Sequence, residues 1–401
     1  MSQFQSPHAR RVVITHALRT PIGRFMGSFA KLSAVDLGVS VVQALFAQAD
    51  LDPALVEGTI LGCGRQAGSG PNPARQVAVR AGVPVESTAW TMNMACASGL
   101  KTINLAADDI AAGRRDVMLV GGMESMSGLP YMLPDMRMGY RLGHAKVIDG
   151  MYKDGFDCPL AEMVMGATAE NLAKKYSITR DEQDSFALAS QHKSQAARES
   201  GHTAVEIAPV TVKGRKGDVV VEKDEHVRDN ATMAQLARLP TVFDPVAGTV
   251  TPGNASGITD GAAALLVMSL DKALELGYTP LAEVGFSAEA GVDPKIMGIG
   301  PVPVCRDLTT RSGLGVDDFD LIELNEAFAA QVIACDRELK LPADRLNVNG
   351  GAISLGHPIG ATGARIVVTL LHEMARRDAK RGLATLCVSG GMGIGTTFHR
   401  A

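Results

Sequence analysis

The sequence lacks the features that would place it in a membrane, on nucleic acid or outside the cell. No apolar run approaches the roughly 20 residues that a bilayer-spanning helix needs. The net charge of −4 leaves no dominant basic field, so neither nucleic acid nor a membrane is expected as a partner. The first residues contain no apolar signal core, which predicts a cytoplasmic protein.

Signatures of metal sites and nucleotide cofactors are also missing. The six cysteines are scattered without a C-x-x-C pair, so neither a disulfide framework nor a zinc cluster is indicated. The sequence contains neither the G-x-G-x-x-G nor the G-x-x-x-x-G-K-[ST] phosphate-binding pattern. Aromatic residues make up only 4%, whereas hydrophobic residues make up 46% and glycines number 43, which favours a large core of closely packed small residues.

Strand and helix patterns alternate through the first part of the chain, which favours a parallel α/β sheet. The expected elements are a strand at residues 11–15, a helix at Ala34–Ala49, a strand at residues 56–62, a helix at residues 74–81 and a later strand at residues 261–269. Residues 123–247 carry methionine-rich loops, short helices and a hairpin around residues 214–217, so this segment is expected to be an insertion. The Tyr-Thr-Pro of residues 278–280 predicts a domain boundary.

An internal repeat relates residues 93–123 to residues 349–392. Each copy begins with Asn and small residues, continues as a helix that ends near an Arg pair, enters an apolar strand and stops at Gly-Gly-Met. This order predicts two similar α/β halves with a cleft where they meet. Coincidence between two helices rich in glycine and alanine is the alternative.

Cys96 is the first candidate for chemistry, because it lies among small residues where a helix is expected to begin near Ala97. The partial positive charge and free N–H groups of a helix N-terminus stabilise a thiolate and can lower the pKa of a thiol. The same N–H groups can bind an oxyanion when the thiol attacks a carbonyl. A buried structural cysteine is the alternative.

Three further candidates come from the second half of the chain. His357 is held between a glycine and a proline and could act as a base, although it could also be an ordinary loop histidine. Cys387 ends the strand of the second repeat and would face the cleft, where a thiol of near-neutral pKa suits reversible proton transfer to carbon, although on position alone a core cysteine is the favoured interpretation. Asn325 and Glu326 follow a strand expected at residues 319–324, where site residues of α/β sheets are common, although Asn325 could instead cap a helix.

Together these residues resemble the thiolase family, closest to its short-chain type that makes and cleaves acetoacetyl-CoA. The resemblance spans residues 12–398. Its specific stretches are residues 93–99, 253–261 (GNASGITDG), 291–300 (GVDPKIMGIG), 325–328 (NEAF), 350–360 and 387–393. The resemblance implies a five-layered α-β-α-β-α fold of two pseudo-symmetric halves, residues 1–270 and 271–401. It also implies that residues 123–247, within the first half, form a loop domain for CoA binding and oligomerisation.

The resemblance implies roles for the four candidates. Cys96 would carry the acyl group, His357 would activate Cys96 and, with a water held by Asn325, stabilise a thioester oxygen, and Cys387 would remove the α-proton of a second acetyl-CoA. The backbone N–H groups of Cys96 and Ser389 would form a second oxyanion hole. The implied substrates are acetyl-CoA, acetoacetyl-CoA and CoA, with no separate cofactor and no metal.

The resemblance also implies which residues contact CoA and the acyl group. Arg228 would lie near the adenine and Ser256 along the pantetheine, whereas a tunnel and acyl pocket would be lined by Phe156, Val164, Met165, Met297 and Phe328. For these residues, plain core packing is the alternative. Residues 123–147 resemble a tetramer-forming loop, which predicts a homo-tetramer, a dimer of dimers.

Two positions depart from the family pattern. Ser389 stands where the short-chain enzymes usually have glycine, but its backbone N–H is kept. Val164 stands where they often have histidine or an aromatic residue, so a longer or branched acyl group could fit. A 3-ketoacyl-CoA thiolase of longer chain length therefore stays open as an alternative. A ketoacyl-synthase-like condensing enzyme is disfavoured by Cys387, and a non-catalytic CoA-binding scaffold by the intact set of candidates.

Overall fold

The computed structural model describes residues 6–400 as two similar halves, the first of which is interrupted by a large insertion. The first half contains β1 (Val12–Arg19), β2 (Gly23–Arg24), α1 (Ala34–Ala49), η1 (Pro53–Leu55), β3 (Gly58–Gly62), α2 (Pro73–Arg80), β4 (Thr88–Met92), α3 (Ser98–Ala111), β5 (Val117–Ser125) and β12 (Thr259–Ser269). The second contains α7 (Leu270–Glu275), β13 (Ala282–Gly291), η4 (Pro294–Ile299), α8 (Pro301–Ser312), η5 (Val316–Asp318), β14 (Leu321–Leu324), α9 (Ala329–Leu339), α10 (Ala352–Leu355), α11 (Ile359–Arg377), β15 (Arg381–Val388) and β16 (Met392–His399). The halves predicted from the sequence also include residues 1–5 and 401, which lie outside the described residues.

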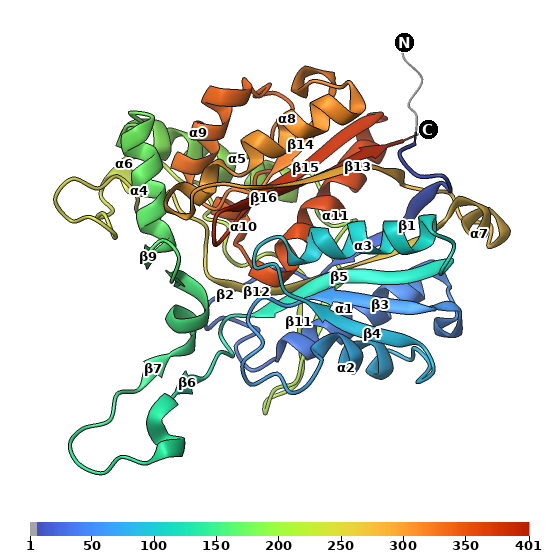
Figure 1. Ribbon diagram of the computed structural model, residues 1–401, viewed down its shortest axis with the longest axis horizontal. Helices are drawn as coiled ribbons and strands as arrows, with labels where there is room; N and C mark the ends of the chain where they lie inside the picture. Colours follow the sequence, from blue (N-terminus) through green and yellow to red (C-terminus); the bar gives the residue numbers. More distant parts are fainter. Residues whose placement is uncertain (1–5, 401) are drawn as a thin grey trace.

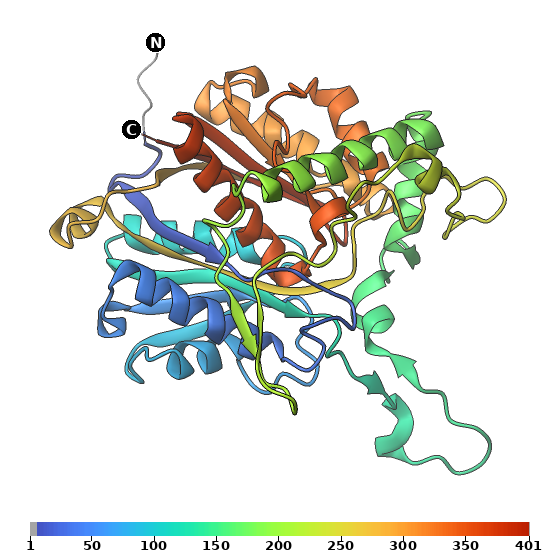
Figure 2. The same ribbon diagram turned by 180° about the vertical axis from the view of Figure 1, so that it is seen from behind.

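The insertion consists of two longer helices with short strands and turns, and it packs against both halves. It contains β6 (Tyr131–Met132), η2 (Pro134–Met138), β7 (Ile148–Asp149), η3 (Tyr152–Phe156), β8 (Asp157–Cys158), β9 (Met163–Val164), α4 (Met165–Lys175), α5 (Arg180–Glu199), β10 (Val210–Val212), β11 (Val219–Val221) and α6 (Met233–Ala237). β10 and β11 pair antiparallel, which confirms the hairpin predicted around residues 214–217. The loop between β6 and β7 projects away from the body (Figures 1 and 2).

One continuous sheet runs through both halves in the order β14-β15-β16-β13-β1-β12-β5-β3-β4, with β2 added to β12. The halves are joined where β1 pairs with β13, at Val13↔Glu283 and Ile14↔Ala282. The prediction of a parallel sheet is only partly right. β4, β3 and β5 are parallel, and so are β14 and β15, but β12 returns from the insertion antiparallel to β5 and needs no crossover helix.

The arrangement of the helices in layers around the sheet follows from which of their faces are apolar. α1 and α2 cover the outer face of the first half and α8 covers the outer face of the second, while α3 and α11 lie together between the two parts of the sheet (Figure 1). Every residue of α11 from 359 to 371 is buried, as expected for a helix enclosed by sheets and helices. The predicted five-layered α-β-α-β-α fold is thus confirmed.

Individual elements match their sequence patterns to within a few residues. Helix α1 has the predicted bounds because Ser33 and Asp36 form a capping box at its start and Asp50 ends it in the left-handed conformation. The repeat is confirmed by the side-by-side packing of α3 and α11, with one difference. Gly390 and Gly391 form a turn after β15, whereas β5 continues through Gly-Gly-Met to Ser125.

Within residues 6–400, no helix combines the length and the apolarity that crossing a lipid bilayer demands.

Candidate active site

A cavity of about 480 Å³ lies where the two halves and the insertion meet. It receives Cys96 from the first half, His357 and Ser389 from the second, and Phe156 and Arg228 from the insertion. Of the residues predicted to contact CoA or the acyl group, Ser256, Val164, Met165, Met297 and Phe328 also line it. The structure therefore brings together residues from stretches of the chain that are more than 200 positions apart.

The backbone just before α3 holds Cys96 at the cavity. Ala95 has a φ of 45°, in the left-handed region that is unfavourable for a residue with a Cβ. Two side chains stabilise this turn: the Asn93 carbonyl accepts the Ala95 N–H at 3.0 Å, and the Ser98 hydroxyl accepts the Met94 N–H at 2.9 Å and donates to the Ala95 carbonyl at 2.6 Å. Cys96 therefore precedes the first turn of α3 in a defined orientation and is half-buried.

His357 lies in hydrogen-bond contact with Cys96, with 3.2 Å between Nε2 and Sγ. On its other side, Nδ1 lies 2.6 Å from the hydroxyl of Thr362, which itself donates to the Pro358 carbonyl at 3.0 Å. Since the Thr362 hydroxyl proton is engaged by Pro358, its oxygen accepts the proton on Nδ1. This arrangement leaves the Nε2 lone pair facing the thiol of Cys96, as a base requires.

Burial sets the protonation states of this pair. It lowers the pKa of His357 from 6.5 to about 3, aided by the positive charges of Arg365 and Arg65, so the imidazole is neutral at neutral pH. Burial also raises the pKa of the Cys96 thiol, against the lowering effects of Arg65 and of the backbone N–H groups of Ser389 and Cys96. The lowered pKa expected from the helix N-terminus is therefore not found, and the resting pair is thiol and neutral imidazole.

Cys387 and Asn325 are buried and are not among the residues that line the cavity. Cys387 is buried in a small cluster with Met297, Met165 and Phe328, three of the predicted lining residues. Burial, and then the neighbouring Cys96, raise the pKa of its thiol well above the usual value, so the near-neutral pKa expected from the sequence is wrong. Asn325 follows β14, is buried, and neither its amide nitrogen nor its oxygen has a hydrogen-bond partner among residues 6–400.

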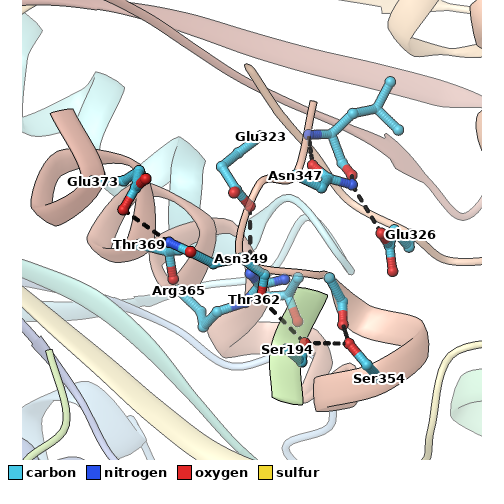
Figure 3. A network of polar contacts seen from close by, with 12 residues as sticks. Ser194, Glu323, Glu326, Asn347, Asn349, Ser354, Thr362, Arg365, Thr369 and Glu373 are labelled. Carbon is cyan, nitrogen blue, oxygen red and sulfur yellow. Dashed lines mark hydrogen bonds and ion pairs between the residues drawn. The ribbon is translucent and has the colours of Figure 1, made fainter. Parts of the chain in front are cut away.

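A buried polar network supports the loop that carries Asn325 (Figure 3). The Asn347 side chain accepts the Leu324 N–H at 2.9 Å, donates to the Leu324 carbonyl at 2.8 Å and donates to Glu326 at 3.0 Å. Glu326 also accepts from Ser190 at 2.7 Å and from the Ile353 N–H at 3.2 Å. Glu326 thus ties this loop to the segment that leads into His357.

Arg365 and Glu323 form a buried ion pair in the same region. Arg365 extends from α11 toward Glu323 (Figure 3), with Nη1 3.5 Å from a carboxylate oxygen, and both side chains are buried. Burial raises the pKa of Glu323 to about 8 even though Arg365 opposes the rise. The positive charge of Arg365 reaches His357 and helps to keep it neutral.

Several cavity residues were not found from the sequence. They include Arg24, Phe25, Arg65, Tyr152, His226, Val242, Phe243, Thr251 and Ile258. Arg65 had a usable signal, because it comes three residues after the carboxyl end of β3, at the edge where α/β sheets bind ligands. For Thr362, which is hydrogen-bonded to His357, the sequence offers no signal beyond its position five residues after that histidine.

Comparisons with known proteins agree with this geometry. Models of the thiolase N-terminal and C-terminal domains match residues 12–271 and 278–400. Acetyl-CoA acetyltransferases of Pseudomonas aeruginosa and Cupriavidus necator are 52% and 51% identical to the chain, over 97% of this chain and 99% of each relative. A crystal structure of the acetyl-CoA acetyltransferase of Bacillus anthracis has a TM-score of 0.95 at 44% identity, covering 98% of this chain and 100% of that one. Human mitochondrial 3-ketoacyl-CoA thiolase in complex with CoA has a TM-score of 0.94 at 39% identity, covering 98% of each chain.

Proposed function

The chain belongs to the thiolase family, and from this premise we propose that it is an acyltransferase that condenses two acetyl-CoA molecules to acetoacetyl-CoA and CoA, and runs the reverse thiolysis. The observation that carries the proposal is the contact of 3.2 Å between Cys96 Sγ and His357 Nε2 at a cavity large enough for a thioester. Acetyl-CoA, acetoacetyl-CoA and CoA are its substrates and products.

In the first step, His357 takes the proton of Cys96 as the sulfur attacks the thioester carbonyl of acetyl-CoA. Because the resting pair is neutral, proton transfer and attack occur together and no free thiolate accumulates. The backbone N–H groups of Cys96 and Ser389, which lower the pKa of the Cys96 thiol, bind the oxyanion that develops. CoA leaves with the proton from His357, and Cys96 is left acetylated.

In the second step, Cys387 removes an α-proton from another acetyl-CoA, and the carbanion attacks the acetyl group on Cys96. Cys387 first gives its thiol proton to His357, and burial makes the resulting thiolate a strong base. His357 returns this proton to Cys96 when acetoacetyl-CoA is released. His357 and a water held by Asn325 stabilise the enolate oxygen, for which the unpartnered buried amide of Asn325 is suited. The new carbon–carbon bond gives acetoacetyl-CoA and frees Cys96.

Arg228 and Ser256 contact CoA in this proposal, at the mouth and along the wall of the cavity. Arg228 is exposed and donates to the Pro252 carbonyl at 3.1 Å, so its charge is free to face the nucleotide. Phe156, Met165, Met297 and Phe328 provide apolar contacts for the pantetheine and the acyl group. A longer-chain 3-ketoacyl-CoA thiolase is the second candidate, because Val164 is a small lining residue.

The enzyme assembles as a homo-tetramer through the projecting loop between β6 and β7. The loop and its flanking strands expose the apolar side chains of Tyr131, Leu133, Met136, Met138, Tyr140, Leu142 and Val147. Within residues 6–400, the first-half sheet ends at the edge strand β4. Replacing Met138 and Leu142, which are 87% and 99% exposed, with glutamate should reduce the mass in light scattering from tetramer to dimer. An unchanged mass would contradict a role for the loop.

A cytoplasmic location fits the state of the cysteines. All six are free, and Cys96 and Cys387 have to remain thiols for the proposed reaction. A reducing compartment keeps thiols in this form.

The function is tested by thiolysis of acetoacetyl-CoA and of 3-ketoacyl-CoAs of increasing length. Activity highest with acetoacetyl-CoA supports the short-chain function, and a maximum at medium or long chains favours the second candidate. Cys96→Ala should abolish both thiolysis and the uptake of one acetyl group seen by mass spectrometry. Cys305→Ala, a matched change at a buried cysteine outside the cavity, is the control and should retain both.

A further inference from the structure

Arg65 places a cationic side chain in the wall of the catalytic cavity. The residue is only 7% exposed, and it lines the same cavity as Cys96 and His357. A Cβ built on Gly155 would lie 2.7 Å from its Nε and 3.2 Å from its Nη2, so the guanidinium packs directly over Gly155, next to Phe156. It therefore lies on the side of the cavity where the lining is otherwise apolar and suited to an acyl chain.

The guanidinium of Arg65 makes few polar contacts with the protein. Its Nη1 donates to the Gly64 carbonyl at 3.3 Å, its Nε has no hydrogen-bond partner among residues 6–400, and it forms no ion pair within that range. Buried arginines are almost always paired, because an uncompensated charge is costly to remove from water. An arginine in this state inside a substrate cavity indicates that the substrate supplies the partner.

Glu124 is the carboxylate whose charge interacts with Arg65, and its oxygens already accept other hydrogen bonds. Its oxygens accept the backbone N–H groups of Gly64 at 3.0 Å, Arg65 at 3.1 Å and Gly360 at 2.8 Å. Burial raises its pKa to about 7, so that it is partly protonated at neutral pH. Glu124 therefore does not form the contact ion pair that the guanidinium lacks.

Stabilisation of the Cys96 thiolate is the other use that Arg65 could have. Its charge does lower the pKa of Cys96, but burial outweighs it and the pKa remains raised. Arg65 also lowers the pKa of His357, which disfavours the imidazolium that would accompany a thiolate. The charge of Arg65 thus favours the thiolate of Cys96 but disfavours the imidazolium of His357, so stabilising that ion pair does not explain its position. A bound anion is the better explanation.

We propose that Arg65 binds a carboxylate at the far end of a short acyl chain attached to Cys96, and that the enzyme accepts acyl groups of the succinyl type as well as acetyl. This inference rests on the proposed thiolase function and extends its substrate class. The planar guanidinium offers a fork of donors that matches a carboxylate, and an apolar acyl group of the same length cannot use it.

The reaction balances as an ordinary thiolysis. Cys96 attacks the C3 carbonyl of a 3-oxo-dicarboxylyl-CoA, the C2–C3 bond breaks, and the electron pair leaves as the enolate of acetyl-CoA, which takes a proton from Cys387. The carboxyacyl group stays on Cys96 with its carboxylate on Arg65. The thiol of free CoA then gives its proton to Cys387 and displaces the carboxyacyl group as a carboxyacyl-CoA, while Cys96 regains from His357 the proton that it lost on attack.

The test compares thiolysis of 3-oxoadipyl-CoA with that of 3-oxohexanoyl-CoA, which has a methyl group in place of the carboxylate. In the unmodified enzyme, kcat/KM should be higher for 3-oxoadipyl-CoA. Because a hydrogen-bonded charge contributes roughly ten- to hundredfold, Arg65→Leu should lower the ratio of the two kcat/KM values by that factor, and Arg65→Lys by less. Arg80→Leu, an exposed arginine on α2 away from the cavity, is the control and should keep the ratio.

The outcomes separate this inference from the function on which it rests. Cleavage of acetoacetyl-CoA without any preference for 3-oxoadipyl-CoA over 3-oxohexanoyl-CoA would overturn the carboxylate site and leave the thiolase function standing. No cleavage of any of the three substrates would overturn both. A preference that persists in folded Arg65→Leu would overturn the role of Arg65, and the ratio in the unmodified enzyme decides the case if the variant does not fold.

Discussion

Replacing Thr362 with valine removes one hydroxyl from behind the catalytic imidazole and keeps the shape of the side chain. Thr362 is fully buried, and its oxygen lies 2.6 Å from Nδ1 of His357. The Pro358 carbonyl loses the hydroxyl as a donor but keeps the N–H groups of Ala361 and Thr362, each at 2.9 Å. The single group left without a partner is therefore the Nδ1 proton of His357.

The cost follows from this one orphaned donor. Leaving a buried N–H unsatisfied costs about 1–3 kcal/mol, which is roughly 5- to 150-fold in a rate constant. The imidazole can avoid this cost by moving its proton to Nε2, but that nitrogen then no longer accepts the proton of Cys96. By either route, Thr362→Val should lower kcat/KM for acetoacetyl-CoA thiolysis and slow the acetylation of Cys96 by acetyl-CoA within that range.

The assay measures both rates together with the melting temperature. Thr362→Ser restores the hydroxyl and should return acetylation to near the rate of the unmodified enzyme, which a loss of packing alone would not do. If folded Thr362→Val acetylates Cys96 within twofold of the unmodified rate, the claim that this hydroxyl fixes the proton of His357 is wrong.

Three other predictions follow from the same geometry. Cys387→Ala should still be acetylated on Cys96, with release of one equivalent of CoA, but should form acetoacetyl-CoA at least ~100-fold more slowly because the base is missing; equal losses in both steps would refute the division of roles. The pKa of His357 falls from 6.5 in the unfolded chain to about 3 in the folded protein. Between pH 6.5 and 5, therefore, only the unfolded chain takes up this proton, and the free energy of unfolding decreases by about 2 kcal/mol as the pH is lowered over that range. Urea titrations should show a smaller loss over that range in His357→Asn. Gly122→Ala would place a Cβ 2.0 Å from the Gly360 carbonyl and should destabilise the fold by about 1–3 kcal/mol, seen as a lower melting temperature, and an unchanged one would contradict the close approach.

Much of the architecture could be predicted from local patterns. The helix Ala34–Ala49 was predicted from periodicity, and its end signals lie within a few residues of sequence. The internal repeat predicted that the segments of Cys96 and His357 would meet, because two similar halves with equivalent helices pack about a common centre. The direction of β12 was missed, since strand periodicity is the same in parallel and antiparallel pairs.

The electrostatics of the site could not be predicted in the same way. The helix N-terminus argued for a lowered pKa of Cys96, but burial depends on the cavity walls, which the insertion and the second half supply. The importance of Arg65 depends on which partners it lacks, and an absence of contacts is invisible in a linear pattern. Thr362 acquires its role only through the fold of the loop that carries His357.

The pairing of β1 with β13 has a consequence for how the molecule moves and unfolds. Because the strands of both halves share one hydrogen-bonded ladder, the halves cannot swing apart as separate lobes without breaking backbone bonds at Val13 and Ile14. Entry and exit of a bulky thioester therefore fall to the peripheral segments around Phe156 and Phe243, not to a hinge through the middle. Thermal melting of the whole body as one cooperative transition is the corresponding signature in calorimetry.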